Sequence, residues 1–184
     1  MVRLLIILFS FNLFADLLPN GMLKDLNKKK IDLIDLVDGD AAVINFWFLA
    51  CEPCKKEMKY LSQFNSKYSK YGFKVLSVNT DNARTLNKVK PFVNSQDYSF
   101  PVLLDPKSLY FRKIGAKLCP YLLVVNKKGE IVNRHAGYNP GDEIKLENEI
   151  VSLIYSEIME DSTLVDSSII KILEKVKPLD SQID

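Results

Sequence analysis

Residues 43–58 read V-I-N-F-W-F-L-A-C-E-P-C-K-K-E-M and place two cysteines where one periodic pattern gives way to another. The apolar run at 41–49 is short and rich in β-branched and aromatic residues, which is typical of a strand buried on both faces. From residue 52 to residue 71 the apolar residues recur at steps of three and four, the spacing of an amphipathic helix. Pro53 near its start and Gly72 after its end are residues that helix termini favour. The segment therefore predicts a buried strand that runs directly into a helix.

The rest of the chain continues this alternation of strands and helices. A turn signal at Asn20-Gly21 indicates a small hairpin within residues 16–40 that leads into the core. The later patterns predict strands at 73–78, 100–104, 121–126 and 130–135, and helices from Asp81 or Asn82 to Asn94, at 107–114 and at 142–158. Strands joined by helices, with an antiparallel hairpin near the end, indicate an α/β fold around a central sheet.

The two ends of the chain differ from this pattern. Residues 1–15 carry an early positive charge at Arg3, a short apolar stretch and a small residue at Ala15, which is the arrangement of a secretory signal. The stretch is too short to span a bilayer comfortably, so we expect a signal peptide or, less favoured, an N-terminal anchor that tethers the protein to a membrane. We assign residues 16–160 to one domain and residues 161–184 to a C-terminal extension with a helix at 164–176.

The composition limits the classes of function. With 184 residues, 47% apolar and 26% charged, the chain is long enough and apolar enough for one globular core. Its net charge of +2 gives no basic excess that would favour nucleic acid. The cysteines are Cys51, Cys54 and Cys119, and an odd number in an exported protein argues against a purely structural disulfide framework.

Cys51 and Cys54 are suited to redox chemistry by their place at the start of a helix. The first helical turn has free N–H groups and the positive end of the helix dipole, which stabilise a thiolate at Cys51. Cys54 lies one turn later, so it can resolve a mixed disulfide that Cys51 has formed. The alternative is half of a zinc site, which needs two more ligands. Only Cys119 and His135 are available, and we expect His135 to be an ordinary exposed strand residue, so we predict no metal site and no cofactor.

The stretch at 43–58 resembles the active-site segment of thioredoxin-like proteins, and it is most similar to the ResA/TlpA-like group that reduces cytochrome c apoproteins. The resemblance extends from about Asn20 to Val151, and Glu-Pro between the cysteines with Lys-Lys-Glu after them are its most specific features. It implies a thioredoxin fold, with a central mixed sheet flanked by helices, to which the residue patterns add an N-terminal hairpin and a C-terminal helical extension.

The resemblance also implies roles for residues outside the cysteine pair. Pro120 matches the cis-proline of the family, which faces the cysteines, and the backbone of Cys119 would then offer hydrogen bonds to an extended substrate segment. Glu57 matches an acid that exchanges a proton with the second cysteine, although a solvated helix glutamate is the alternative. Asn45 stands where cytoplasmic thioredoxins keep a buried acid.

Several positions near the cysteines complete the expected substrate-binding surface or depart from the family. We count Glu52, Pro53 and Trp47 among the substrate-binding residues, although Trp47 also fits the core. A negative charge at Glu52 would raise the pKa of Cys51 and favour a reductant weakly. Ala50 replaces the usual Trp before the first cysteine, and Cys119 replaces a Thr or aliphatic residue. Cys119 is either a small apolar residue or a third active thiol.

The sequence therefore predicts a thiol–disulfide oxidoreductase of the cell envelope, exported to the periplasm or the outer face of the cytoplasmic membrane. Its expected partners are exported proteins that contain disulfides, such as apocytochrome c, and a membrane thiol donor that re-reduces it. A peroxiredoxin-like peroxidase is a competing class, but Phe48 stands where that class has Thr. Two more classes are compatible with the cysteines: a thiol-based metal chaperone without enzymatic activity, and a binding module that its cysteines only stabilise.

Overall fold

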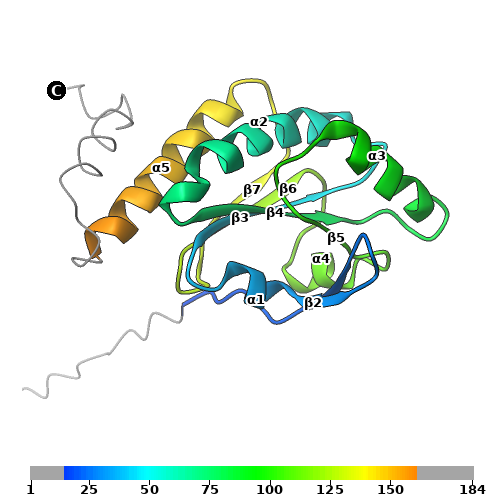
Figure 1. Ribbon diagram of the computed structural model, residues 1–184, viewed down its shortest axis with the longest axis horizontal. Helices are drawn as coiled ribbons and strands as arrows, with labels where there is room; N and C mark the ends of the chain where they lie inside the picture. Colours follow the sequence, from blue (N-terminus) through cyan, green and yellow to red (C-terminus); the bar gives the residue numbers. More distant parts are fainter. Residues whose placement is uncertain (1–14, 161–184) are drawn as a thin grey trace, which may run out of the picture.

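A mixed seven-stranded sheet with the strand order β2-β1-β5-β4-β3-β6-β7 runs through the computed structural model, which describes residues 15–160 (Figure 1). The strands are β1 (Met22–Asp25), β2 (Lys30–Asp32), β3 (Ala41–Trp47), β4 (Phe73–Asn79), β5 (Val102–Leu104), β6 (Tyr121–Val125) and β7 (Ile131–Ala136). The helices are α1 (Leu33–Val37), α2 (Glu52–Tyr68), α3 (Val89–Gln96), α4 (Leu109–Lys113) and α5 (Asp142–Glu160), with short 3-10 turns at Ser69–Tyr71 and Leu86–Lys88. The predicted α/β fold is confirmed.

Strand β3 lies inside the sheet and carries the chain to the cysteines. It pairs parallel to β4 and antiparallel to β6, so both of its edges are hydrogen-bonded. All seven of its residues are buried, because helices cover both faces of the sheet. Burial on both faces explains why this stretch is apolar throughout and lacks the alternation of a half-exposed strand.

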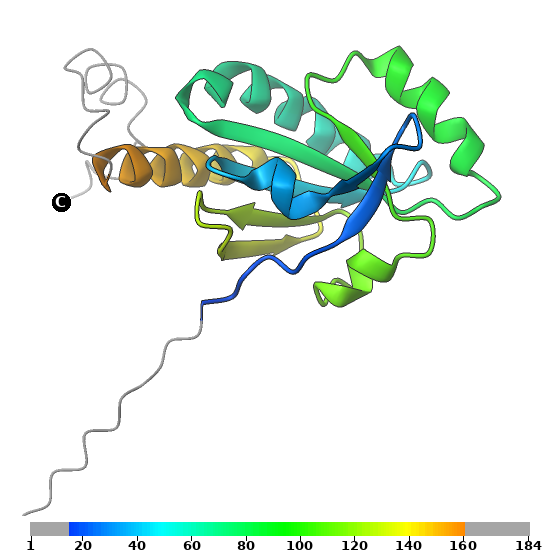
Figure 2. The same cartoon turned by 60° about the horizontal axis from the view of Figure 1, so that its bottom comes forward.

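The helices form a layer on each face of the sheet. Helices α2, α3 and α5 cover one face, whereas α1 and α4 cover the other (Figure 1). Successive side chains of β3 point to opposite faces, so Trp47 packs in the core under α2 and Phe46 packs in the core near α4. The turned view shows the hairpin of β1 and β2 at one edge of the sheet and β6 with β7 at the other (Figure 2).

The N-terminal hairpin is present, but it is followed by a short helix that the sequence did not predict. The hairpin was expected within residues 16–40, whereas part of that range, Leu33–Val37, forms α1. The carboxylate of Asp32 caps this helix and accepts a hydrogen bond from the backbone N–H of Ile34 at 3.3 Å. Leu33 and Val37 are buried, so α1 closes one side of the core below the sheet.

The helix expected from Asp81 or Asn82 to Asn94 begins later than predicted. A short 3-10 turn at Leu86–Lys88 precedes α3, which runs from Val89 to Gln96. Pro91 is the third residue of α3, and in the first turn its missing N–H has no partner to lose. The helical segment predicted at 52–71 ends where expected, because the 3-10 turn at 69–71 follows α2 and Gly72 then has a left-handed φ of 72°.

Two predictions lie largely or wholly outside the described residues. These are the signal peptide or anchor at 1–15 and the C-terminal helix at 164–176. Between residues 15 and 160, no helix combines the length and the apolar character that crossing a membrane requires.

Candidate active site

Cys51 and Cys54 form a disulfide at the junction of β3 and α2, with their Cα atoms 5.3 Å apart. Cys51 is the N-cap residue of α2, and its Sγ accepts a hydrogen bond from the backbone N–H of Cys54 at 3.2 Å. A thiolate at Cys51 would receive the same N–H group and the helix dipole. Cys51 keeps 5% of its surface exposed and Cys54 keeps none, so Cys51 is the sulfur that another protein can reach.

The loop before Cys51 is held in place by a buried carboxylate at the end of the neighbouring strand. Asp81, which follows β4, accepts hydrogen bonds from the backbone N–H of Leu49 at 2.7 Å, from Asn79 Nδ2 at 2.8 Å and from Thr85 Oγ1 at 2.6 Å. The sequence treated Asp81 as a helix cap and missed this role. The strand pattern could have indicated this role, because parallel strands β3 and β4 bring their carboxyl ends to one edge of the sheet, so that Asp81 lies near the loop after β3.

The peptide bond between Cys119 and Pro120 is cis, as the resemblance implied. Cys119 is a free, half-buried thiol that packs against the core cluster containing both active-site cysteines. Its Sγ lies 4.0 Å from the hydroxyl of Thr80, which itself donates to the carbonyl of Trp47 at 3.1 Å. Burial raises the pKa of the Cys119 thiol to about 11. At neutral pH the Cys119 thiol is therefore mostly protonated, which makes it a slow nucleophile.

Glu57 lies one turn after Cys54 on the buried face of α2 and is only 5% exposed. The alternative of a solvated glutamate is therefore wrong. Burial raises the pKa of Glu57 to about 8, an effect that the charge of His135 opposes and that of Asp142 reinforces. A carboxyl group with such a pKa can both hold and release a proton near neutral pH.

Glu57 differs from the other buried carboxylates of residues 15–160 because one of its oxygens has no partner. Asp81 accepts the three hydrogen bonds described above, and Asp105 accepts from the backbone N–H groups of Leu109 and Phe111, both at 2.9 Å. In Glu57, Oε2 is buried without a hydrogen bond. Asp81 and Asp105 thus organise local backbone, whereas Glu57 has an oxygen available for chemistry.

The structure corrects the expectations for Trp47 and His135. Trp47 is fully buried, so it belongs to the core and does not reach a bound substrate. His135 is half-buried rather than freely exposed, and its Nε2 lies 2.7 Å from Glu149 Oε2. Glu149 lies fourteen residues further along the chain, on α5, and nothing in the sequence marks it as a partner.

Glu52 and Pro53 lie on the surface beside Cys51. The carboxylate of Glu52 forms an ion pair with Lys55 Nζ at 2.7 Å, and the hydrogen bond and charge of Lys55 lower the pKa of Glu52. Lys55 therefore offsets part of the negative charge that Glu52 was expected to place beside Cys51. Asn45 is fully buried at the position of the missing acid, and neither polar atom of its side chain has a partner.

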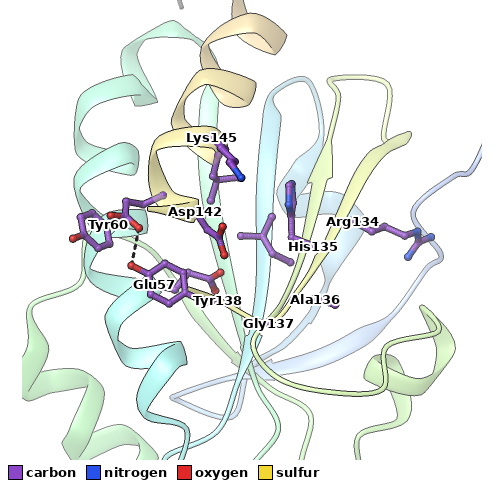
Figure 3. Close-up of a pocket in the computed structure, with 12 residues that line it drawn as sticks. Glu57, Tyr60, Arg134, His135, Ala136, Gly137, Tyr138, Asp142 and Lys145 are labelled. Carbon is purple, nitrogen blue, oxygen red and sulfur yellow. Dashed lines mark hydrogen bonds between the residues drawn. The ribbon is translucent and has the colours of Figure 1, made fainter. Parts of the chain in front are cut away.

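A cavity of about 330 Å³ opens next to Glu57, between α2, β7 and the start of α5 (Figure 3). Its wall is polar on several sides, and its residues include Tyr60, His135, Tyr138 and Asp142. The part of the chain that the structure describes contains no group of three or more His, Cys, Asp or Glu residues placed to hold a metal ion.

An accessible sulfur at a helix N-terminus, a buried sulfur one turn later and a cis-proline, all on a sheet covered by helices, define a thioredoxin-like thiol–disulfide oxidoreductase. Comparison with known proteins agrees with this class. The chain belongs to the Redoxin family, whose sequence model matches residues 15–150. The curated relatives of the chain include thiol–disulfide oxidoreductases of the ResA type.

Two of these relatives and one solved structure show the extent of the similarity. ResA of Bacillus thuringiensis (strain Al Hakam) is 32% identical over 127 residues, which cover 69% of this chain and 72% of the relative. ResA of Halalkalibacterium halodurans is 30% identical over 138 residues, or 75% of each chain. A thioredoxin-like protein of Porphyromonas gingivalis, known from a solution structure, superposes with a TM-score of 0.66 at 28% identity and covers 77% of this chain and 94% of its own.

Proposed function

We propose that this protein reduces disulfide bonds in exported proteins, apocytochrome c among them, on the outer side of the cytoplasmic membrane. The observation that carries the proposal is the buried carboxyl group of Glu57 one turn from Cys54, because it provides a proton acceptor for the resolving thiol. The reducing direction and the cytochrome substrate rest on the similarity to the ResA group. Export rests on the signal-like residues 1–15.

The reaction starts from the dithiol form of the protein. The Cys51 thiolate attacks one sulfur of the substrate disulfide, so that the substrate S–S bond breaks and a mixed disulfide forms. The first substrate sulfur leaves as a thiolate and takes a proton from water. Cys54 then gives its proton to the Glu57 carboxylate and attacks Cys51 Sγ. The mixed disulfide breaks, the second substrate thiolate leaves, and the protein carries the Cys51–Cys54 disulfide.

The reaction transfers two electrons from the protein to the substrate. The substrate disulfide gains two electrons and two protons, while the Cys51–Cys54 pair is oxidised. A second thiol donor must return the electrons, because the compartment outside the membrane is oxidising. We propose a dithiol of a membrane protein for this role.

The surface around Cys51 favours an extended, partly apolar substrate segment. Phe48 and Leu118 precede the two parts of the site, Cys51 and Cys119, and their side chains are 37% and 50% exposed. Exposed apolar side chains beside a reactive group are a feature of protein-binding surfaces. The substrate backbone would pair with the backbone next to Pro120, as in other cases of strand addition.

The test is reduction of a peptide with two cysteines three residues apart, oxidised to its disulfide, by the reduced protein. We expect Cys51→Ser to abolish reduction and Cys54→Ser to accumulate the mixed disulfide at Cys51. Glu147→Gln, on α5 and paired with Lys67 away from the cysteines, is the control and should reduce the peptide at the wild-type rate. If Cys51→Ser still reduces the peptide, or if Cys54→Ser accumulates no mixed disulfide, the proposed reaction is wrong.

A further inference from the structure

One residue that lines the cavity beside Glu57 belongs to a half-buried charge pair that the reaction above does not use. The pair consists of His135 on β7, which lines the cavity, and Glu149 on α5, and their side chains meet at 2.7 Å. Glu57 and His135 both line the cavity, and Figure 3 shows them coming from α2 and β7 with Asp142 between them in that view. The cavity thus connects Glu57, one turn after Cys54, to the histidine of this pair.

Six other titratable groups line the cavity, and the two cations among them, Arg134 and Lys145, are engaged elsewhere or solvated. The six are Tyr60 on α2, Arg134 on β7, Tyr138 in the following loop, and Asp142, Glu143 and Lys145 on α5. Asp142 accepts from the backbone N–H of Asn139 at 2.8 Å, and its negative charge reinforces the raised pKa of Glu57. Arg134 donates to Asp16 at 2.8 Å and to the carbonyl of Ile114 at 3.0 Å, and Figure 3 shows it pointing away from Glu57. Tyr138 donates to Glu143 at 2.7 Å. Lys145 is exposed, so water screens its charge.

His135 is therefore the cation whose charge acts on Glu57. Its hydrogen bond to Glu149 raises the pKa of His135, which favours the protonated ring. Although partial burial acts in the opposite direction, the hydrogen bond from His135 lowers the pKa of Glu149. The 2.7 Å contact thus favours an ion pair, and its positive end is the one that lowers the pKa of Glu57.

We propose that His135, held protonated by Glu149, is a positioning residue that sets how readily Glu57 accepts the proton of Cys54. This inference rests on the proposed role of Glu57 in resolution. Three observations carry it: the shared cavity, the buried Glu57 oxygen without a partner, and the 2.7 Å contact between His135 and Glu149. The charge of His135 keeps a fraction of Glu57 ionised, and the cavity gives its proton a way to solvent.

The coupling works in both directions. When Glu57 ionises, its negative charge raises the pKa of His135, so the ring keeps its proton more firmly. When Glu57 takes the proton of Cys54, this support weakens. His135 is thus most firmly protonated when Glu57 is ionised, which is the state in which Glu57 can accept the proton of Cys54.

The experiment measures the titration of Glu57 by the NMR shift of its side-chain carboxyl carbon, from pH 5 to pH 10, in the disulfide form. We expect Glu149→Gln and His135→Gln to raise the titration midpoint, and the double variant to match His135→Gln alone. The sign is decisive for Glu149→Gln. Removing a negative charge would lower the midpoint if Glu149 acted on Glu57 directly, but it raises the midpoint if Glu149 acts by keeping His135 protonated.

Glu147→Gln is the matched control, because Glu147 lies on the same helix and pairs with Lys67 and Tyr68, away from the cavity. It should leave the Glu57 midpoint unchanged. A lowered midpoint in Glu149→Gln, or an unchanged midpoint in His135→Gln, would overturn the inference.

The same variants are then assayed for resolution, as the release of a thiol from the mixed disulfide at Cys51 against pH. A midpoint raised by one pH unit lowers the ionised fraction of Glu57 at pH 7 about tenfold, so resolution at that pH should slow about tenfold. If the NMR midpoint moves and the pH profile of resolution does not, the inference falls together with the role proposed for Glu57. An unmoved NMR midpoint with a normal pH profile overturns the inference alone.

Discussion

Replacement of Glu57 by Gln should remove a large pH dependence from the stability of the folded protein. Burial raises the pKa of Glu57 from 4.5 to about 8. Between these two values the folded protein retains a proton that the unfolded chain has released. The unfolded chain therefore binds fewer protons, and the free energy of unfolding falls as the pH rises through this window. Above pH 8 both forms are ionised and the loss is complete.

The size of this loss follows from the difference between the two pKa values. At 1.36 kcal/mol for each pH unit, it amounts to about 5 kcal/mol across the whole window and to about 3 kcal/mol at pH 7. Because Glu57 is only 5% exposed, solvent does little to screen the effect. Glu57→Gln keeps the size of the side chain but has no proton to release, so the free energy of unfolding of this variant should lack the pH dependence caused by Glu57.

Urea unfolding of the disulfide form at pH 5 and pH 9 measures the effect. We expect wild type to lose several kcal/mol more than Glu57→Gln between these two pH values. Glu147→Gln is the control, because hydrogen bonds from Lys67 and Tyr68 outweigh partial burial and lower the pKa of Glu147. Glu147 is then ionised in both the folded and the unfolded protein from pH 5 to pH 9, so this variant should lose as much stability as wild type. Wild type and Glu57→Gln with parallel stability curves, within about 1 kcal/mol, would refute the burial argument.

Three further predictions test the scaffold of the site. Asp81→Ala leaves three donors near the active-site loop without their acceptor, so unfolding in urea should show a loss of about 3 kcal/mol; an unchanged midpoint would contradict this role. Gly21→Ala places a Cβ inside the ring of Tyr110 and should cost about 2 kcal/mol, measured as a lower Tm, whereas an unchanged Tm would show that the ring can move. With the disulfide intact, Cys119 should be the one thiol that alkylates. Because its pKa is about 11 against an ordinary 9, it should react at pH 7.5 at roughly a hundredth of the rate of an exposed cysteine. Labelling at the rate of an exposed cysteine would contradict the burial of this thiol.

The predicted core elements agree with the structure where the signal is local. The apolar run that became β3 and the helical period that became α2 are properties of neighbouring residues. Strands β4, β6 and β7 and helix α5 fall within a residue or two of their predicted ends for the same reason. The cysteine pair was predicted from its spacing and from its place where a strand gives way to a helix, both of which are local features of the sequence.

The errors occur where a distant contact competes with a local pattern. Asp81 looked like a helix cap, but its carboxylate is taken by the backbone of Leu49, and the helix starts eight residues later. Gly21 looked like a turn glycine. Its φ is not positive, and the reason for glycine is the ring of Tyr110, which is eighty-nine residues away in the chain.

The chemistry of the site divides in the same way. Residue order is enough to place a reactive sulfur at a helix N-terminus, since the N–H groups that stabilise it belong to the next turn of the same chain segment. The proton affinity of Glu57 has no such local origin. It depends on how completely β7 and α5 exclude water from the carboxyl group and on the charge that His135 and Glu149 bring to it. Burial and charge pairing are sums over residues far apart in sequence, so only the folded arrangement fixes them.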